Sequence, residues 1–462
     1  MEKSLENISS EKFKFYPHWI FDYNSKKYIY GSFSNRIFEL DDVTYKFLIN
    51  GEKIDSTYEY DEIVNTLEKE FIIKTDENLE ILNRMFNEID KSNKIICTNI
   101  TLMISQACNL RCVYCYGEGG EYSNKGYMDF DTAKAAVDWL MENSPEDQSI
   151  SITFFGGEPL LSFELMEEIV EYANHKALEK KRTIKYTMTT NGLLINDKVE
   201  KFLLEHNIYT QISMDGTKET QDANRYYDNH KGCYDDVLYH TESLRKKNKL
   251  GVRATISPKD LDLVKNIEHL VLLGFSKVSW ANASNLMNEE DFEKLKLSNH
   301  VLMNHFYELI NNGDFEKAKK YNMITKFLNR IDNPTPKLRS CGAGRHMIAV
   351  DIKGDIFPCH RFVGIEEFKL GNIKNMKISE ANKLPIYQQL GIHHFPECVK
   401  CEVQGLCGGA CINENYYDTG NITMPSKTQC DYIRSMCKDL IKLYIRLNTE
   451  QKNVLLNKKI SC

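Results

Sequence analysis

Three cysteines lie close together in the segment ACNLRCVYCYG (107–117). Cys108, Cys112 and Cys115 are spaced C-x3-C-x2-C, and GGEP follows at 156–159. Cysteine thiolates are the usual protein ligands of iron–sulfur clusters, and a four-iron cluster normally takes four of them. A structural zinc ion would be closed by a fourth Cys or His, but no His lies in or near this segment. The three thiols therefore predict an iron–sulfur cluster with one iron open to a ligand from outside the protein.

A second set of seven cysteines lies in the C-terminal part of the chain. It reads Cys341-x12-Gly354-x4-Cys359, then Cys398-x2-Cys401-x5-Cys407-x3-Cys411-x18-Cys430. Such regular spacing predicts metal binding rather than disulfides. The part C-x2-C-x5-C-x3-C, taken alone, is also compatible with zinc. The other four cysteines, Cys97, Cys233, Cys437 and Cys462, fit scattered buried thiols.

Length and composition restrict the class of protein. A chain of 462 residues predicts two or three domains, and a hydrophobic fraction of 42% can fill sizeable cores. The net charge of −7, without a basic stripe carrying interleaved aromatics, argues against nucleic-acid binding. The first residues, MEKSLENISSEKFKFY, lack the apolar core of a signal peptide, and no run of about 18 apolar residues occurs that could span a membrane. We expect a cytoplasmic protein that binds neither membrane nor nucleic acid.

The cysteine loop must be positioned by the strands and helices that the sequence predicts between residues 96 and 310. Six β-rich runs, with helical stretches between them, are ICTNITLMIS (96–105), SISITFF (149–155), TIKYTMTT (183–190), YTQISM (209–214), GVRATIS (251–257) and SKVSWAN (276–282). Strands alternating with helices predict an α/β fold with a parallel sheet. A closed TIM barrel would need eight such units, so an open, partial (β/α)6 barrel fits better. Active sites of such barrels lie on the loops after the strands, which is where the cysteine loop falls.

The flanking regions differ in pattern from the barrel. Residues 1–95 show three β-like runs, then Asp41 and Asp42 as helix N-terminal residues, a helix ended by Gly51, and two further helical stretches at 60–71 and 77–91. This order predicts a small winged-helix-like domain, although a simple N-terminal extension of the barrel is also compatible. A bridging helix and linker, 311–340, precede a cysteine-rich C-terminal domain at 341–462.

The three thiols together with Tyr114 and GGEP resemble the radical S-adenosylmethionine (SAM) superfamily. The resemblance implies that the open iron binds the amino and carboxylate groups of SAM, and that SAM is cleaved to a 5′-deoxyadenosyl radical that abstracts a hydrogen atom. It implies contacts with SAM from Tyr114, Gly156, Gly157, Glu158, Pro159, Thr190, Asn191, Ser213, Asp215 and Arg225. Among these, Tyr114 is expected at the adenine, Glu158 at the amino group and Arg225 at the carboxylate. Each residue alone is equally compatible with an ordinary turn or surface position, and their recurrence at successive strand ends is what supports the set.

The seven C-terminal cysteines are similar to the SPASM domain of radical SAM enzymes. The resemblance implies one complete auxiliary [4Fe–4S] cluster held by four residues, Cys398, Cys401, Cys407 and Cys430. It implies a second auxiliary cluster, nearer the active site, held by Cys341, Cys359 and Cys411. No further cysteine lies shortly before Cys341. This leaves two alternatives, an open iron that binds a substrate thiolate or a fourth ligand from His346, His360, Cys437 or Cys462.

The whole layout resembles maturases that build thioether cross-links in ribosomally made peptides, the sactipeptide and ranthipeptide enzymes, SCIFF maturases among them. It implies a precursor peptide whose leader adds a strand to the N-terminal domain, and an external reductant such as flavodoxin or ferredoxin. Joining a thiol to a carbon removes two hydrogens, whereas the radical takes one, so auxiliary clusters favour a net oxidation. Asp215 is the barrel side chain considered as a base. The alternatives are carbon–carbon cross-linking, formylglycine formation as in sulfatase maturases, and a non-catalytic iron–sulfur sensor or electron carrier.

Overall fold

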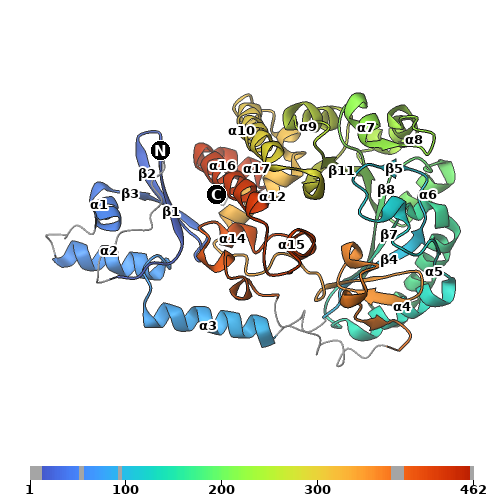
Figure 1. Ribbon diagram of the computed structural model, residues 1–462, viewed down its shortest axis with the longest axis horizontal. Coiled ribbons are helices and arrows are strands. Elements are labelled where there is room, and N and C mark those ends of the chain that lie inside the picture. The colour runs from blue at the N-terminus through green and yellow to red at the C-terminus, as the bar shows by residue number, and fades with distance from the viewer. Residues whose placement is uncertain (1–12, 51–56, 92–95, 376–389, 458–462) are drawn as a thin grey trace. The chain divides into compact units, whose positions relative to one another are not determined.

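The structure is a computed structural model that describes residues 13–50, 57–91, 96–375 and 390–457 (Figure 1). The chain divides into two compact units. One, here called the terminal unit, contains residues 1–92, 326–341 and 390–452. The other, here called the barrel unit, contains residues 93–325, 342–389 and 453–462.

Six parallel strands form the centre of the barrel unit. They are β4 (Asn99–Gln106), β7 (Ile150–Gly156), β8 (Ile184–Thr190), β9 (Tyr209–Ser213), β11 (Leu250–Ile256) and β12 (Lys277–Asn282). The sheet order, β12–β11–β9–β8–β7–β4, follows the order along the chain, so each strand pairs with the next one. The intervening helices are α4 (Phe130–Asn143), α5 (Phe163–Glu179), α6 (Asp197–Glu205), α7 (Lys218–Asn224), α8 (Tyr234–Lys246) and α9 (Leu263–Leu272). This confirms the predicted α/β fold with a partial barrel.

The two faces of this sheet differ in chemistry. Along β7, Ile152 and Phe154 are fully buried, whereas the alternate residues Ser151 and Thr153 are half-buried. Helices α4 and α5 lie on one side of the sheet in Figure 1, and each buries apolar side chains such as Val137 and Ile169. On the opposite face the Nδ2 of Asn99 donates to Ser151 Oγ at 2.7 Å and to Thr153 Oγ1 at 3.0 Å. This hydroxyl-rich side, here called the polar face, is turned away from the helices because side chains alternate along a strand.

Short strands extend the barrel sheet beyond β4. In the order of the sheet they are β13 (Met347–Val350), β14 (Asp355–Phe357) and β15 (Gly371–Asn372), while β6 (Gly126–Tyr127) also pairs with β4. Strand β13 is parallel to β4, and β14 returns antiparallel to β13. The sequence does not predict this extension. It places the first part of the predicted C-terminal domain, including Cys359, in the barrel unit.

Helices follow the barrel strands and lead back to the terminal unit. They are α10 (Glu289–Asn311), α11 (Phe315–Lys319) and α12 (Asn322–Asp332). Helix α10 begins with a reciprocal cap, since Asn288 accepts from the Asp291 amide and Asp291 accepts from the Asn288 amide. Helix α12 starts in the barrel unit and ends in the terminal unit.

The terminal unit opens with a three-stranded antiparallel sheet in the order β1–β2–β3. Its elements are β1 (His18–Tyr23), β2 (Lys26–Gly31), β3 (Arg36–Leu40), α1 (Asp42–Asn50), α2 (Thr57–Lys69) and α3 (Asp76–Lys91). Ile29, Phe47 and Ile72 belong to its core. Asp41 Oδ1 accepts the Thr44 amide at 2.6 Å, so the predicted helix start is correct. The predicted end of that helix, Gly51, lies outside the described residues.

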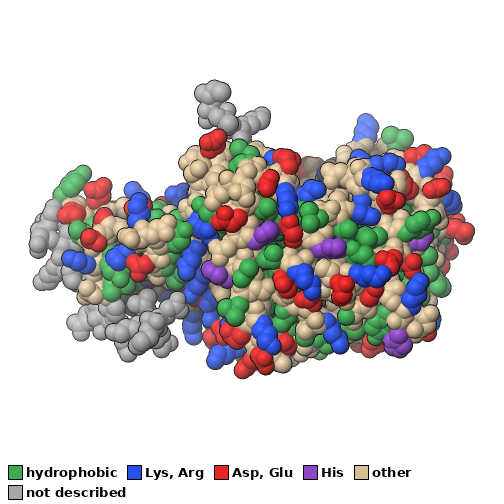
Figure 2. All heavy atoms as spheres, turned by 90° about the horizontal axis from the view of Figure 1, so that it is seen from above, with side chains coloured by type: hydrophobic (Ala, Val, Ile, Leu, Met, Phe, Trp, Pro, Cys, Tyr) green, Lys and Arg blue, Asp and Glu red, His purple; other side chains and the backbone are tan. Residues whose placement is uncertain are grey.

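The C-terminal part of the terminal unit is helical. Its helices are α14 (Gln404–Cys407), α15 (Ile412–Thr419) and α16 (Lys427–Arg446), and α17 (Thr449–Leu455) follows. Within the described ranges, we find no helix with the length and apolar character needed to cross a membrane. Acidic and basic side chains are interspersed over the face of the molecule shown in Figure 2.

Candidate active site

The three cysteines of the first group lie on the loop that leaves β4, at the carboxyl end of the parallel strands. Within this loop β5 (Arg111–Cys112) pairs with β10 (Arg225–Tyr226), which places Arg225 opposite Cys112. The Cys115 amide donates to the Cys112 carbonyl at 3.1 Å, and the Leu110 amide lies 3.5 Å from Cys108 Sγ. The loop thus holds all three thiols at the mouth of the barrel, as expected from their position after the first strand.

The environment of these thiols fits an iron–sulfur cluster. Burial, together with the neighbouring charge of Glu158, raises the pKa of Cys108 to about 11. Burial raises the pKa of Cys112 to about 12, although the Arg225 charge opposes it. Such thiols stay protonated at neutral pH unless a metal stabilises the thiolate. No three cysteine sulfurs among the described residues lie within 4.8 Å of one another, whereas zinc–sulfur bonds of about 2.3 Å would hold sulfurs roughly 3.8 Å apart.

The GGEP segment is packed against the start of the cysteine loop. The Gly157 amide donates to the Ser105 carbonyl at 2.7 Å, and the Glu158 amide donates to the Ala107 carbonyl at 2.8 Å. A Cβ at Gly156 would lie 2.0 Å from the Ser105 oxygen, and one at Gly157 would lie 2.2 Å from the Ala107 oxygen. Only glycine permits so close an approach of two backbones. Pro159 then opens a short 3-10 turn, Pro159–Ser162.

Glu158 is fully buried and connects two strand ends. Its carboxylate accepts from the Leu160 amide at 3.0 Å, the Thr190 hydroxyl at 2.7 Å and the Asn191 amide at 2.8 Å. Burial raises the pKa of Glu158 to about 7, while these hydrogen bonds oppose the rise. Glu158 therefore joins the loop after β7 to the end of β8. Its contact with the amino group of SAM stays a prediction.

Arg225, Asp215 and Tyr114 form one buried network beside Cys112. Arg225 donates through Nε to Asp215 Oδ2 at 3.1 Å and through Nη2 to Oδ1 at 3.2 Å, and its Nη1 lies 3.8 Å from Cys112 Sγ. The Tyr114 hydroxyl also donates to Asp215, and the Arg225 guanidinium lies 5.2 Å from the Tyr114 ring centre. Because the Asp215 carboxylate is 0% exposed and carries this ion pair, it is not placed to act as the base considered from the sequence.

The remaining residues predicted at SAM occupy neighbouring strand ends. Asn191 donates through Nδ2 to Asn109 Oδ1 at 2.7 Å, which joins the end of β8 to the cysteine loop. Ser213 ends β9 and is half-buried. Asn109 was not among the predicted residues, although its position between two motif cysteines was an available signal. The structure therefore brings the predicted residues to one edge of the sheet, and their individual contacts with SAM stay predictions.

Four cysteines of the second group come together in the terminal unit. Cys398 lies in a 3-10 turn, Cys407 ends α14 and Cys430 lies in the first turn of α16. Burial, together with the charges of the other cysteines, raises the pKa of Cys398 and brings that of Cys430 to about 12. Cys401 interacts electrostatically with both. The set Cys398, Cys401, Cys407 and Cys430 is compatible with the complete cluster predicted from the sequence.

A fifth cysteine adjoins this set. Cys437 on α16 is fully buried, and burial, with the charges of Cys407 and Cys401, raises the pKa of its thiol well above the usual value. Lys337 donates to the Cys407 carbonyl at 2.9 Å. Cys437 was one of the alternative ligands for the other auxiliary cluster. Another alternative, Cys462, lies outside the described residues.

The predicted set Cys341, Cys359 and Cys411 is divided between the units, so it stays a prediction. Cys341 and Cys411 belong to the terminal unit, and Cys359 belongs to the barrel unit, just after β14.

Within the barrel unit, the residues after Cys359 lie against the cysteine loop. The His360 ring is 4.5 Å from the Phe155 ring and 6.3 Å from that of Tyr116. The Arg361 guanidinium is 5.4 Å from the Tyr116 ring. Burial, with the Arg361 and Arg253 charges, lowers the pKa of His360 to about 3, so its imidazole is neutral.

Comparisons with known proteins agree with this site. Residues 102–271 match the radical SAM superfamily, and residues 341–403 match SPASM, an iron–sulfur cluster-binding domain. An uncharacterized protein of Methanocaldococcus jannaschii is 32% identical over 279 residues, which are 60% of this chain and 89% of the relative. The radical SAM cyclopropyl synthase TigE of Paramaledivibacter caminithermalis is 24% identical over 83% of each chain. The cysteine-type anaerobic sulfatase-maturating enzyme of Clostridium perfringens (strain ATCC 13124) is 25% identical over 66% of this chain and 86% of its own.

Solved structures share the fold. That of anSMEcpe with bound AdoMet has a TM-score of 0.65 at 20% identity and covers 77% of this chain and 97% of its own. That of Streptococcus suis SuiB bound to precursor peptide SuiA has a TM-score of 0.51 at 15% identity and covers 87% and 96%. The chain therefore belongs to the radical SAM superfamily: it is a radical SAM enzyme with a SPASM domain, and its cofactors are SAM and [4Fe–4S] clusters.

Proposed function

We propose that this enzyme installs thioether cross-links in a ribosomally made precursor peptide. When bound, SAM and its cluster supply the 5′-deoxyadenosyl radical that takes a hydrogen atom from the substrate. In the overall reaction an S–H and a C–H bond break and an S–C bond forms, so the peptide loses two hydrogens. The radical accounts for one of them. The remaining electron and proton must leave the substrate by another route.

The terminal unit supports a peptide as the substrate. The described residues of the N-terminal sheet pair only in the order β1–β2–β3, so β3 is an edge strand. An extended peptide binds such an edge through main-chain hydrogen bonds. The structural relatives include SuiB solved with its precursor peptide and anSMEcpe solved with the Cp18Cys peptide. We assign leader-peptide recognition to residues 1–95 as part of this proposal.

The position of Cys359 supports a net oxidation of the peptide, which the proposed thioether formation requires. The hairpin β13–β14 pairs with β4, and the segment after it brings His360 to Phe155, at the end of β7. Cys359, which precedes His360, interacts electrostatically with Tyr116 of the first cysteine loop, so a residue of the second cysteine group adjoins that loop. A net oxidation needs an electron acceptor near the reacting carbon, and an isomerisation does not. An external reductant such as flavodoxin or ferredoxin would supply the electron that starts each SAM cleavage.

The test uses iron-reconstituted enzyme, SAM, a reductant and, if a reading frame beside this gene encodes one, a short cysteine-rich peptide as the substrate. We expect a product lighter by two hydrogens per cross-link. For each link, one thiol fewer should react with an alkylating reagent, and one 5′-deoxyadenosine should form. The same peptide with its cysteines replaced by alanine should stay unmodified. If that peptide still loses hydrogens, the thioether assignment is wrong, although the enzyme would remain a peptide oxidase.

A second candidate is carbon–carbon bond formation, because the cyclopropyl synthase is similar over 83% of this chain. That product would lose hydrogens but keep every alkylatable thiol. A third, formylglycine formation, is suggested by the sulfatase-maturating relative. It would yield an aldehyde that a hydrazine reagent traps. Thiol titration and aldehyde trapping on one reaction mixture therefore separate the three outcomes.

A further inference from the structure

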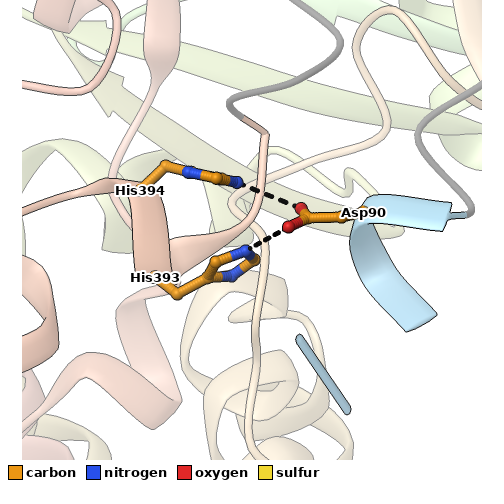
Figure 3. Close-up of side chains that lie close together, drawn as sticks. All are labelled: Asp90, His393 and His394. Atoms are coloured by element: carbon orange, nitrogen blue, oxygen red, sulfur yellow. Dashed lines mark hydrogen bonds and ion pairs between the residues drawn. The ribbon is translucent and has the colours of Figure 1, made fainter. Parts of the chain in front are cut away.

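Three metal-ligating side chains outside the cysteine groups meet in the terminal unit (Figure 3). Asp90 lies in the last turn of α3, and His393 and His394 lie in the 3-10 turn Ile392–His394. The Nε2 of His393 is 2.8 Å from Asp90 Oδ2, and the Nε2 of His394 is 3.1 Å from Oδ1. A possible metal site needs at least three His, Cys, Asp or Glu side chains whose ligand atoms lie within 4.8 Å of one another. Among the described residues, only Asp90, His393 and His394 form such a group.

The two imidazoles are held in place by packing. The His393 ring stacks on Phe86 at 4.5 Å and lies 4.1 Å from the His394 ring. A Cβ at Gly391 would come within 2.4 Å of His393 Cε1, so the backbone also passes directly against the ring. The ring orientation is therefore set before any ion binds, which lowers the entropic cost of binding.

The backbones that carry these side chains are anchored as well. Arg339 Nη2 donates to the Ile89 carbonyl, next to Asp90, at 2.7 Å. The Ile392 amide donates to the Leu338 carbonyl at 2.9 Å. The two sides of the cluster are thus fixed by the same short segment, 338–339.

The polar atoms of the cluster point to a cation as its partner. Each oxygen of the Asp90 carboxylate faces the Nε2 atom of one imidazole, so oxygen and nitrogen ligand atoms converge on one point. His393 Nδ1 is buried without a hydrogen-bond partner, which leaves Nε2 as the polar contact of that ring. Asp90 is 37% exposed and His394 is 32% exposed, so water can reach the cluster as a further ligand.

We propose that Asp90, His393 and His394 form a binding site for one divalent transition-metal ion, with zinc as the expected ion. Zinc commonly takes imidazole and carboxylate ligands, and a tetrahedral ion with bonds of about 2.0–2.1 Å holds ligand atoms roughly 3.3 Å apart. Each imidazole nitrogen lies 2.8 or 3.1 Å from a different oxygen of Asp90, and one ligand atom of each residue lies within 4.8 Å of those of the other two, so the ligand atoms are close enough to share one ion after a modest shift. Imidazole nitrogens select against magnesium and calcium, which prefer oxygen ligands. A water molecule would complete the coordination.

The ion would join two segments far apart in the sequence. Asp90 ends the last helix of the N-terminal module, and His394 precedes the cluster ligand Cys398 by four residues. Bound zinc would therefore clamp the proposed leader-binding module to the chain that carries the complete auxiliary cluster, all within the terminal unit.

The experiment uses the full, cluster-loaded chain with any histidine tag removed, given zinc and then desalted. We expect about one zinc per chain and a zinc K-edge X-ray absorption spectrum with nitrogen and oxygen ligands at about 2.0–2.1 Å and no sulfur shell at about 2.3 Å. Asp90→Asn and His393→Gln should each lose this zinc. The matched control His175→Gln, at a position on α5 where 68% of the side chain is exposed, should keep it.

Three results would overturn the proposal: no zinc retained, a sulfur shell as the main zinc signal, or equal zinc in wild type and Asp90→Asn. A sulfur shell would place the zinc in the cysteine groups. Asp90→Asn is the deciding variant because Asp90 is partly exposed and asparagine has the same shape, so its iron content and circular dichroism should match the wild type.

Discussion

The two cysteine groups are built on different local structures. In the barrel unit the thiols lie on a loop at strand ends, and charged side chains surround them. The Arg225 guanidinium lies next to the Cys112 sulfur, and the charge of Glu158 helps to raise the pKa of Cys108. In the terminal unit the four cysteines lie on or next to two short helical turns and at the start of α16, and the buried thiol of Cys437 lies beside them.

This difference in local structure suits two different functions of an iron–sulfur cluster. A site with three thiols among polar side chains can accept a charged molecule as the remaining ligand, which suits chemistry on SAM. A set of four thiols satisfies every iron of a four-iron cluster, so it suits electron storage or transfer. Replacing single residues in each group should therefore have separable consequences.

The largest effect is expected from Cys112→Ala. Loss of one of three thiols should abolish the cluster at this loop, and 5′-deoxyadenosine formation should fall to the background without enzyme. The measurement is chromatography of SAM cleavage products under reductant. The matched control is Cys97→Ala, a fully buried cysteine at the start of the same barrel, which should retain cleavage. Substantial cleavage by Cys112→Ala would contradict the assignment of this loop.

A smaller but distinct effect is expected from Cys398→Ala. Iron content should fall by about four atoms per chain, because a complete cluster loses a ligand. SAM cleavage should continue while modified peptide falls, so the ratio of 5′-deoxyadenosine to product should rise. Iron analysis and mass spectrometry measure both quantities. Cys437→Ala serves as the control, and if it lowered iron as much as Cys398→Ala, Cys437 would be a ligand.

Much of the barrel follows from local sequence. The six strands appear close to their predicted bounds because β-branched and aromatic residues are concentrated in short runs that alternate with helical stretches. The start of α1 follows from Asp41, whose side chain caps the helix within three residues. Cysteine spacing is also local, which is why both groups are visible in the sequence.

Features made by distant contacts are not visible in the same way. The pairing of β13 with β4 joins residues about 250 positions apart and has no local signal. Asp215 is placed by the strand pattern, but its ion pair with Arg225, which removes it as a base, depends on how the loop after β9 folds back. The cluster of Asp90 and His393 spans 303 positions. Contacts between such distant residues depend on tertiary packing, and the hydrophobic periodicity of one sequence does not predict them.

Next in size is the effect of Asp215→Asn on stability. The change leaves the Arg225 guanidinium buried without its carboxylate, and breaking a buried ion pair in this way typically costs about 3–5 kcal/mol. We expect a lower urea midpoint for the barrel unit and weaker SAM binding, measured by circular dichroism and equilibrium dialysis. Glu205→Gln, in an exposed pair with Lys201, should leave both unchanged. An unaltered midpoint in Asp215→Asn would show that the network beside Cys112 is not a structural support.

The smallest expected effect is the change in stability with pH that Glu158 causes. It concerns only the first cysteine group, where Glu158 lies. Its pKa is about 7 in the folded chain against an ordinary value of 4.5. The folded state therefore holds this proton more tightly, so the stabilisation is complete below about pH 4.5 and is lost as pH rises through about 7, a change of roughly 2–4 kcal/mol.

Glu158→Gln should remove that slope, so the difference in urea midpoint between variant and wild type should change between pH 5 and pH 7.5. The Cys108 thiol, with a pKa of about 11, does not titrate in this range. If the urea midpoints of variant and wild type changed in parallel with pH, the three hydrogen bonds to the carboxylate would outweigh the effect of its burial on the pKa. In that case Glu158 is ionised throughout, and the mouth of the barrel carries a fixed negative charge next to the first cysteine group.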